Sequence, residues 1–284
     1  MADGKVINIG CKTPANVADT LSQTLCVAKT NATVWKLIIL GILAGVYIGF
    51  GAAIATLVAS DVAKYVGVGL GKFFVGGVFS VGLMLVVIAG AELFTGNNLM
   101  LMSALDGRVT YKRVLYKWAV VYFANFVGSI IMAFLMFNTG LLDGGNPSTG
   151  ITALKIANAK VNLSWSMAFT RGILCNILVC LAVWMALASQ NIIGRIWAIF
   201  FPIMTFVALG FEHCIANMYF IPLGIFLKDS NAAGASGLNL SNLNWGGFFN
   251  NIIPVTAGNI VGGALVVALL YWLVYVKPEA KASK

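Results

Sequence analysis

The stretch Gly90-Ala-Glu-Leu-Phe-Thr-Gly-Asn97 lies in a long apolar segment, and a related stretch, Gly210-Phe-Glu-His-Cys-Ile-Ala-Asn217, lies 120 positions later in another. Both follow the pattern G-x-E-x-x-x-small-N, so each places a glutamate beside small residues that interrupt a helix. Broken helices occur at membrane depth only where protein covers them or where they line a cavity. The repeated motif therefore indicates a pathway through a membrane protein with two broken helices.

The composition agrees with a polytopic membrane protein. The 284 residues are 60% hydrophobic and only 10% charged, which is unlike a soluble domain. The net charge of +9 comes from basic residues scattered between apolar runs, so nucleic acid is not an expected partner. We find neither a nucleophile–base pair nor a metal-ligand cluster, and we expect no enzyme activity, metal or cofactor.

The apolar segments predict an all-α fold with six transmembrane helices. A helix needs about 20 residues to cross about 30 Å of hydrocarbon. Four segments have suitable lengths, namely 37–58, 118–137, 167–187 and 252–276. Two others, 71–105 and 196–227, are too long for one straight helix, and each contains one copy of the motif. We therefore expect spans two and five to be broken, at Gly90 and Gly210.

Further matches divide the single transmembrane domain, residues 1–284, into two halves of three spans. The tripeptide Gly-Ile-Leu begins at Gly41 and again at Gly172, and the pattern N-x-V-G begins at Asn125 and again at Asn259. Matches in the same order favour a duplication that relates residues 37–137 to residues 166–276. Because three spans is an odd number, the halves insert in opposite directions, and the site is expected where the broken helices meet.

The distribution of basic residues predicts the orientation. With six spans, twelve of the 18 Lys and Arg residues fall on the side of the two termini, including Lys5, Lys281 and Lys284, and six fall on the other side. The positive-inside rule then places both termini in the cytoplasm and the chain in the cell membrane.

The segment before the first span, residues 14–35, predicts an amphipathic helix. Its apolar residues Val17, Leu21, Leu25 and Ala28 share one helical face. Such a helix is expected to lie on the cytoplasmic surface of the membrane.

The two motifs also contain the candidate functional side chains. His213, the single histidine of the chain, should have a role in the pathway, because an ionisable group costs about 2.5–3.5 kcal/mol to insert at the membrane centre. Glu92 and Glu212 are expected to cap the N–H groups of the half-helices that follow them, with direct contact to a substrate as the alternative. A structural role, bonding to freed backbone groups, is expected for three asparagines, Asn97, Asn217 and Asn176.

The sequence alone leaves two roles open for one further polar residue and gives another a surface position. The hydroxyl of Thr95 can serve a small solute or bond to its own helix, and both roles stay open. Lys160, in the loop before span four, reads as a solvated surface lysine.

Four stretches together resemble the formate/nitrite transporter family. They are A-E-L-F-T-G-N at 91–97, N-F-V-G at 125–128, G-F-E-H-C-I-A-N-M-Y-F-I-P at 210–222, and I-P-V-T-A-G-N-I-V-G-G at 253–263. The resemblance runs from about residue 37 to the end of span six. It implies an aquaporin-like fold, a pore in each protomer of a homopentamer, and transport of small monovalent anions such as formate, nitrite, hydrosulfide, acetate or lactate.

The resemblance also implies residue roles. His213 would be the central histidine, Thr95 its hydrogen-bonding threonine, and Lys160 the vestibule lysine that attracts anions, which replaces the solvated-loop interpretation. A pore-facing asparagine corresponds to Asn176. One constriction would be formed by Leu93 with Phe206, and another hydrophobic ring would contain Phe79 and Leu83. Phe94 is expected along the pathway from the sequence itself, as a bulky apolar residue in the first motif.

We therefore expect transport of weak-acid anions, with formate as the main substrate, lipid as the surroundings, and proton transfer near His213. Nitrite, hydrosulfide, acetate and lactate are alternative substrates. A channel for neutral solutes is an alternative that the architecture permits, and a scaffold or sensor without transport is another.

Overall fold

The computed structural model describes residues 10–145 and 147–277, and their regular secondary structure is helical throughout, as predicted. Five stretches among these residues are long and apolar enough to cross a membrane: Val34–Ala59, Val62–Gly90, Tyr111–Asn138, Trp165–Ala188 and Trp245–Tyr275. Two shorter apolar helices, α11 (Ile192–Ala208) and α12 (Cys214–Leu227), lie between the fourth and the fifth of these stretches. Lys5, Lys281 and Lys284, used in the orientation count, lie outside the described residues.

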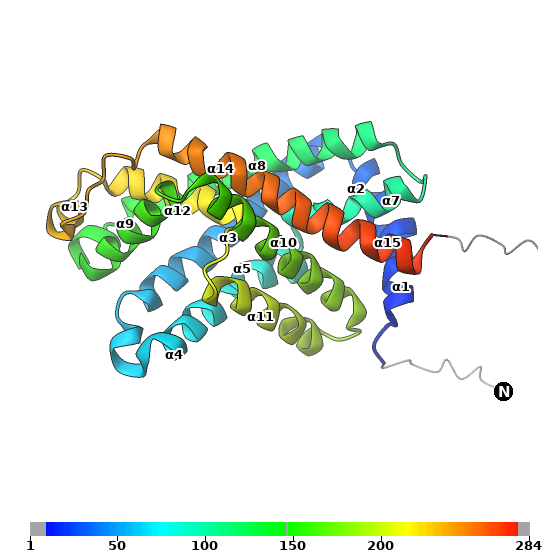
Figure 1. The fold of residues 1–284 in the computed structure, drawn as a ribbon, viewed down its shortest axis with the longest axis horizontal. Helices are drawn as coiled ribbons and strands as arrows, with labels where there is room; N and C mark the ends of the chain where they lie inside the picture. Colours follow the sequence, from blue (N-terminus) through cyan, green and yellow to red (C-terminus); the bar gives the residue numbers. More distant parts are fainter. Residues whose placement is uncertain (1–9, 146, 278–284) are drawn as a thin grey trace, which may run out of the picture.

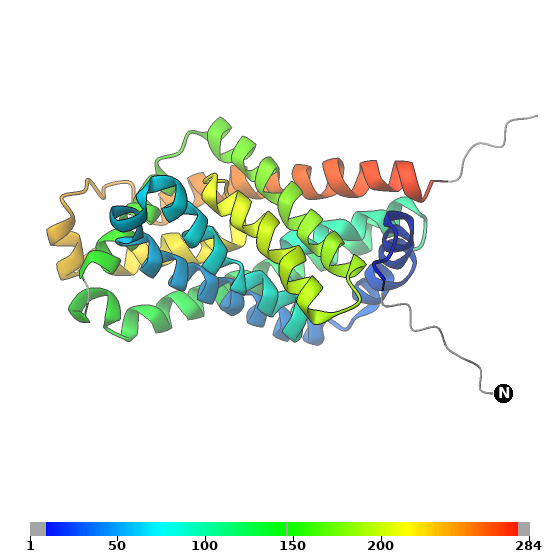
Figure 2. The ribbon, with the colours of Figure 1, turned by 90° about the horizontal axis from the view of Figure 1, so that it is seen from below.

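The long helices run roughly along the long axis of the molecule (Figures 1 and 2). The first half contains α3 (Val34–Ala59), α4 (Val62–Phe79), α5 (Val81–Met84) with η2 (Leu85–Gly90), the short α6 (Phe94–Asn97), η3 (Asn98–Met100) and α7 (Leu101–Leu105), and α8 (Tyr111–Asn138). The second half contains α10 (Trp165–Ala188), α11, α12, and α14 (Trp245–Ile260), which continues through η5 (Val261–Leu269) into α15 (Leu270–Tyr275).

The remaining elements cover the two ends of the molecule. Figure 1 shows α1 (Pro14–Asp19), α2 (Cys26–Asn31) and the end of α15 together at one end, so the first and last described residues lie at the same end. The other end is formed by η4 (Leu141–Gly145), α9 (Pro147–Val161) and α13 (Asn231–Ser236).

The N-terminal helices pack against protein through a face that differs from the predicted one. Val17 and Leu21 are buried as expected, but Ala28 is exposed, while Cys26 and Thr30 are buried. The π-helical turn η1 (Thr20–Leu25) joins α1 to α2. Because a π turn holds more residues than an α turn, the residues after it rotate relative to a regular helix. The predicted face therefore continues only as far as this turn.

Glycines allow close contact between helices of the same half. A Cβ atom added to Gly128 in α8 would meet the carbonyl oxygen of Ile42 in α3, and one added to Gly45 would meet backbone atoms of Asn125 and Ser129. In the second half, a Cβ atom on Gly258 in α14 would meet the backbone of α10. Small residues at such crossings are typical of membrane helices, where packing rather than water drives association.

We expect Gly128→Ala to destabilise the protein by about 1–3 kcal/mol, because the added methyl group overpacks the contact between α3 and α8. Thermal unfolding of the detergent-purified protein measures the effect. Gly69→Ala is the matched control, since nothing lies within 4 Å of a Cβ atom at Gly69. Equal melting temperatures for the two variants would contradict this account of the packing.

Candidate functional site

The first unwound segment lies between η2 and α6. Gly90 ends η2 with a φ of 94°, a conformation that glycine adopts without the steric cost of a side chain. Leu93 is extended, with φ −106° and ψ 123°, and α6 begins at Phe94. The backbone N–H of Glu92 donates to the carbonyl of Leu40 in α3, 3.1 Å away.

The second unwound segment repeats this geometry between α11 and α12. Gly210 has a φ of 75°, His213 is extended with φ −112° and ψ 117°, and α12 begins at Cys214. The N–H of Glu212 donates to the carbonyl of Arg171 in α10, 3.3 Å away. The helix breaks therefore lie at the two predicted motifs.

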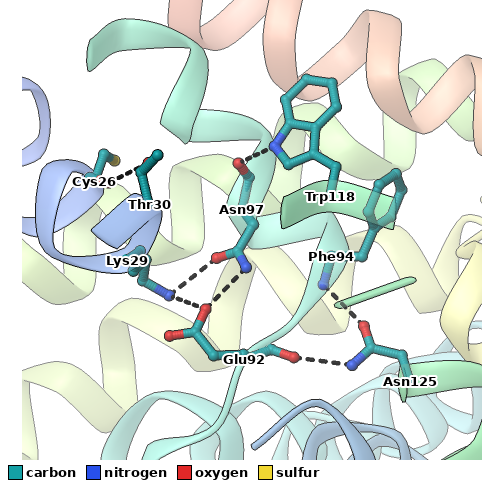
Figure 3. A network of polar contacts seen from close by, with 8 residues as sticks. All are labelled: Cys26, Lys29, Thr30, Glu92, Phe94, Asn97, Trp118 and Asn125. Carbon is teal, nitrogen blue, oxygen red and sulfur yellow. Dashed lines mark hydrogen bonds and ion pairs between the residues drawn. The ribbon is translucent and has the colours of Figure 1, made fainter. Parts of the chain in front are cut away.

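Asn125 in α8 fastens the first unwound segment to its neighbours (Figure 3). Its amide nitrogen donates to the carbonyls of Glu92 and Gly41, both at 2.8 Å, and its amide oxygen accepts from the N–H of Phe94 at 2.9 Å. One side chain thus satisfies both a donor and an acceptor of the broken helix, as a buried backbone requires.

Asn259 in α14 makes the same three bonds in the second half. Its amide nitrogen donates to the carbonyls of Glu212 at 2.9 Å and Gly172 at 2.8 Å, and its oxygen accepts from the N–H of Cys214 at 2.9 Å. The asparagines of the repeated N-x-V-G pattern, rather than the glutamates, therefore accept from the first N–H of each half-helix.

The glutamate side chains bind lysine and asparagine instead, which corrects the predicted capping role. The carboxylate of Glu92 pairs with the ammonium of Lys29 in α2 at 2.8 Å and accepts from the amide of Asn97 at 2.8 Å. The oxygen of Asn97 accepts from the same ammonium at 2.9 Å. Figure 3 shows this triad beside the clamp made by Asn125.

Glu212 forms the corresponding triad in the second half. Its carboxylate pairs with the ammonium of Lys160 at 2.9 Å and accepts from the amide of Asn217 at 2.6 Å. Asn217 also donates to Asn251, whose own amide donates to the carbonyl of Lys160. The side chains of Lys160 and Glu212 are 14% and 5% exposed. Asn97 and Asn217 therefore bind side chains here, and not the freed backbone groups that we expected.

His213, the last residue of the second unwound segment, connects that segment to α6. Its Nδ1 accepts from the N–H of Ala216 at 3.1 Å, in the first turn of α12. A ring nitrogen that accepts carries no proton, so the neutral imidazole has its proton on Nε2. Nε2 lies 2.8 Å from the hydroxyl of Thr95 in α6, and it therefore donates to that oxygen.

Two cavities reach the unwound segments. The first, which we call the His213 cavity, has a volume of about 410 Å³ and is lined by His213, Glu212, Lys160 and Lys72, among others. The second, the Lys29 cavity, has a volume of about 390 Å³ and is lined by residues that include Lys29, Lys36 and Glu92. Each cavity thus contains one glutamate–lysine pair and apolar walls.

The bulky apolar residues are paired differently from the expectation. Phe79 packs edge-to-face against Phe206, with ring centroids 5.8 Å apart, and both line the His213 cavity. Leu83 and Leu93 line the Lys29 cavity instead. All four side chains are buried. The pairs are therefore Phe79 with Phe206 in the His213 cavity and Leu83 with Leu93 in the Lys29 cavity, and the first pair lies where α4 packs against α11.

Phe94 and Asn176 were expected along the pathway, but neither lines one of the two cavities. Phe94 packs against Tyr122 and Trp118 of α8, with centroid distances of 4.9 and 6.2 Å, and it lines neither cavity. Asn176 is buried and donates to the carbonyls of Thr95 and Asn259, so it bonds to backbone groups as the motif analysis expected. In this geometry it joins the two halves.

Sequence reasoning missed Lys29, which we had counted only as a cytoplasmic charge. The signal was present: Lys29 and Lys160 are 131 positions apart, the same offset that relates Gly41 to Gly172. It also missed the clamping role of Asn125 and Asn259, which were noted as repeated residues without a function.

A helical membrane chain in which two cavities meet buried ionisable residues and unwound helices has the features of a channel or transporter. The comparisons with known proteins agree. The family model for the formate/nitrite transporter matches residues 15–273, and the chain belongs to this family.

Similar proteins cover nearly the whole chain. A probable formate transporter of Methanothermobacter thermautotrophicus is 46% identical over 94% of this chain and 98% of its own. The formate channel FocA of Escherichia coli K12 is 38% identical over 93% of this chain and 94% of its own. A solved structure described as a pentameric formate channel with formate bound is 39% identical, covers 86% of this chain and 98% of its own, and superposes with a TM-score of 0.77.

We expect Asn259→Ala to lower the free energy of unfolding markedly, because it leaves the N–H of Cys214 and two carbonyls without their partner. Each buried unsatisfied group costs about 1–3 kcal/mol. Thermal unfolding in detergent measures the loss. Asn138→Ala is the control, since Asn138 is exposed and bonds only within its own helix. A melting temperature equal to that of the parent would show that water replaces the clamp.

Proposed function

We propose that this protein transports small weak-acid anions across the cell membrane, with formate as the main substrate. The observation that carries the proposal is His213, hydrogen-bonded to Thr95 of α6 at 2.8 Å, in a cavity that Lys160 and Glu212 also line. The relatives named for formate support the choice of anion.

The proposed architecture is a single domain with six spans in two inverted, aquaporin-like halves, 37–137 and 166–276. The two breaks make equivalent hydrogen bonds, which supports the repeat. In this proposal α11 and α12 together make one broken span, both termini are cytoplasmic, and the chain assembles as a homopentamer with one pore in each protomer. The pentameric neighbour supports that assembly.

Energetics favour passage of the neutral acid. Moving a bare carboxylate into hydrocarbon costs about 20 kcal/mol in the idealised limit and several kcal/mol after relaxation. Protonating a carboxylic acid with a pKa near 3.9 costs about 4 kcal/mol at pH 7. We therefore propose that the anion takes up a proton before it passes Phe79 and Phe206, and that Leu83 and Leu93 form the second apolar constriction.

The proposed source of the proton is the solution on the entry side, which supplies it to the anion through water in the His213 cavity, so that the net transfer is from hydronium to the anion. The imidazole already accepts from Ala216 through Nδ1, so an additional proton would displace that helix cap. His213 instead donates a hydrogen bond from Nε2, shared between Thr95 and the passing acid. Proton transfer thus takes place near His213, and the neutral ring assists by hydrogen bonding.

Lys160 and Lys29 have matching proposed roles at the two sides. Each ammonium holds a glutamate beside an unwound segment. An anion that reaches Lys160 competes with Glu212 for its ammonium, which places the anion next to His213 before protonation. Lys29 and Glu92 provide the equivalent position in the other cavity.

Two rival functions would each give a different result in liposome experiments. A neutral-solute channel would swell osmotically loaded liposomes without dependence on pH. A scaffold or sensor would give no solute flux at all. The lysine-containing cavities favour the anion pathway over the neutral-solute channel, because an uncharged solute needs no cation along its route.

We expect proteoliposomes that contain the protein to take up formate faster as the outside is acidified. Lowering the external pH by two units raises the protonated fraction about a hundredfold. Radiolabelled formate uptake, with protein-free liposomes and a protonophore as controls, measures the effect, and the same assay compares nitrite, hydrosulfide, acetate and lactate. Formate uptake no faster than in protein-free liposomes would refute the proposed function.

We expect His213→Phe to lower formate uptake at pH 7 by about tenfold, because a lost hydrogen bond in a buried site costs about 1–3 kcal/mol. His213→Asn is the matched variant: asparagine can cap α12 and keeps an N–H donor, so it should retain more uptake than the phenylalanine variant. Both are compared in proteoliposomes after confirming equal insertion. Parent-like uptake by His213→Phe would exclude a role for this ring.

A further inference from the structure

Each cavity contains a second lysine that is separate from the glutamate pair. Lys72 of α4 lines the His213 cavity together with Lys160. Lys36 of α3 lines the Lys29 cavity together with Lys29. Both side chains belong to exposed residues, whereas the ammonium groups of Lys160 and Lys29 are held at 2.9 and 2.8 Å from a carboxylate.

The two lysines of each cavity differ in how much positive charge they present to solvent. Lys160 is bound to Glu212 and also lies 5.5 Å from the ring of Phe220. The opposite charges of this pair offset one another at a distance. In the part of the chain that the structure describes, Lys72 has no carboxylate partner and donates no hydrogen bond. Among the ionisable residues that line this cavity, the uncompensated charge is therefore that of Lys72.

The same arrangement occurs independently in the Lys29 cavity. Lys29 is bound to Glu92 and Asn97, and Lys36 has no carboxylate partner within the described residues. Lys29 and Lys160 occupy equivalent positions in the two halves. Lys36 and Lys72 do not, because the first is on α3 and the second on α4 of the same half. Duplication therefore accounts for the paired lysines but not for the free ones.

We propose that Lys72 and Lys36 are the residues that attract small monovalent anions into the two cavities, while the paired lysines act only at short range. This inference rests on the proposed anion transport. A free charge at the wall of a cavity raises the local concentration of counter-ions and their rate of entry. A compensated pair contributes little to that long-range field and serves as the next contact for an anion that has already entered.

Ionic strength separates the two roles. Interactions between exposed charges are screened over about 30 Å at 0.01 M salt but over about 3 Å at 1 M. Attraction by an exposed lysine should therefore disappear in concentrated salt. Contact with Lys160, whose side chain is 14% exposed, is less affected by screening because buried pairs are screened less.

The test uses the Lys36→Gln/Lys72→Gln double variant in proteoliposomes, because it alters the entry cavity of each protomer whichever way that protomer inserts. Formate uptake is measured under a fixed proton gradient, at subsaturating and saturating formate, over a series of ionic strengths. At about 0.01 M salt we expect subsaturating uptake to fall about threefold, because the half-saturating concentration of formate rises. The difference from the parent should vanish at about 0.5 M salt.

Three further variants complete the test. The Lys36→Arg/Lys72→Arg double variant keeps both charges and should restore uptake at low salt. Lys64→Gln removes a lysine of α4 that does not line the cavity and should lower uptake at low salt much less than the double glutamine variant does. Lys160→Gln should lower uptake at low and high salt alike, because it removes a contact that screening barely affects.

The inference is overturned if the double glutamine variant has the parent's half-saturating concentration at low salt, or if Lys64→Gln reduces uptake as strongly. These outcomes differ from a failure of the proposed function. If the parent protein itself takes up no formate, anion transport is wrong, whereas parent uptake that is indifferent to Lys36 and Lys72 contradicts only the role of these two lysines.

Discussion

The need to satisfy every backbone group of two unwound segments inside an apolar protein is the constraint on which the rest of the structure depends. Asn125 and Asn259 meet it in the same way, each with two donated bonds and one accepted bond. Each clamp joins three helices of one half, since it spans the break, a glycine carbonyl of the first helix and the asparagine's own helix. The glycines that allow close helix contact, such as Gly45 and Gly128, bring these groups within reach.

With the backbone satisfied by asparagine, the glutamate side chains are free to form ion pairs at the cavity walls. A buried carboxylate without a partner would be costly, and Lys29 and Lys160 supply that partner from elements outside the broken spans. Both lysines precede the first long helix of their half. The helices that cover the ends of the molecule are therefore part of the site, and α2 and α9 each contribute one charge.

The two breaks make equivalent hydrogen bonds but differ in the side chains that they present. His213 and Leu93 occupy equivalent places in the two motifs, 120 positions apart, and both are the extended residue before a half-helix. One break therefore presents a ring that caps α12 and is hydrogen-bonded to Thr95, while the other presents an aliphatic side chain that lines the Lys29 cavity. The aromatic pair Phe79 and Phe206 lies next to the histidine, with Phe206 and His213 nearly parallel.

Local patterns in the sequence determined the helical class and the positions of the two breaks. Each of these follows from properties of a single segment: its length, its hydropathy, or a glycine that permits a positive φ. The tertiary structure decided which side chains meet. It paired Phe79 with Phe206, directed Phe94 away from both cavities, gave the capping role to asparagines of distant helices, and brought Lys29 to Glu92 across 63 positions of sequence. Such pairings depend on how segments far apart in the chain pack together, and no local sequence pattern specifies that packing.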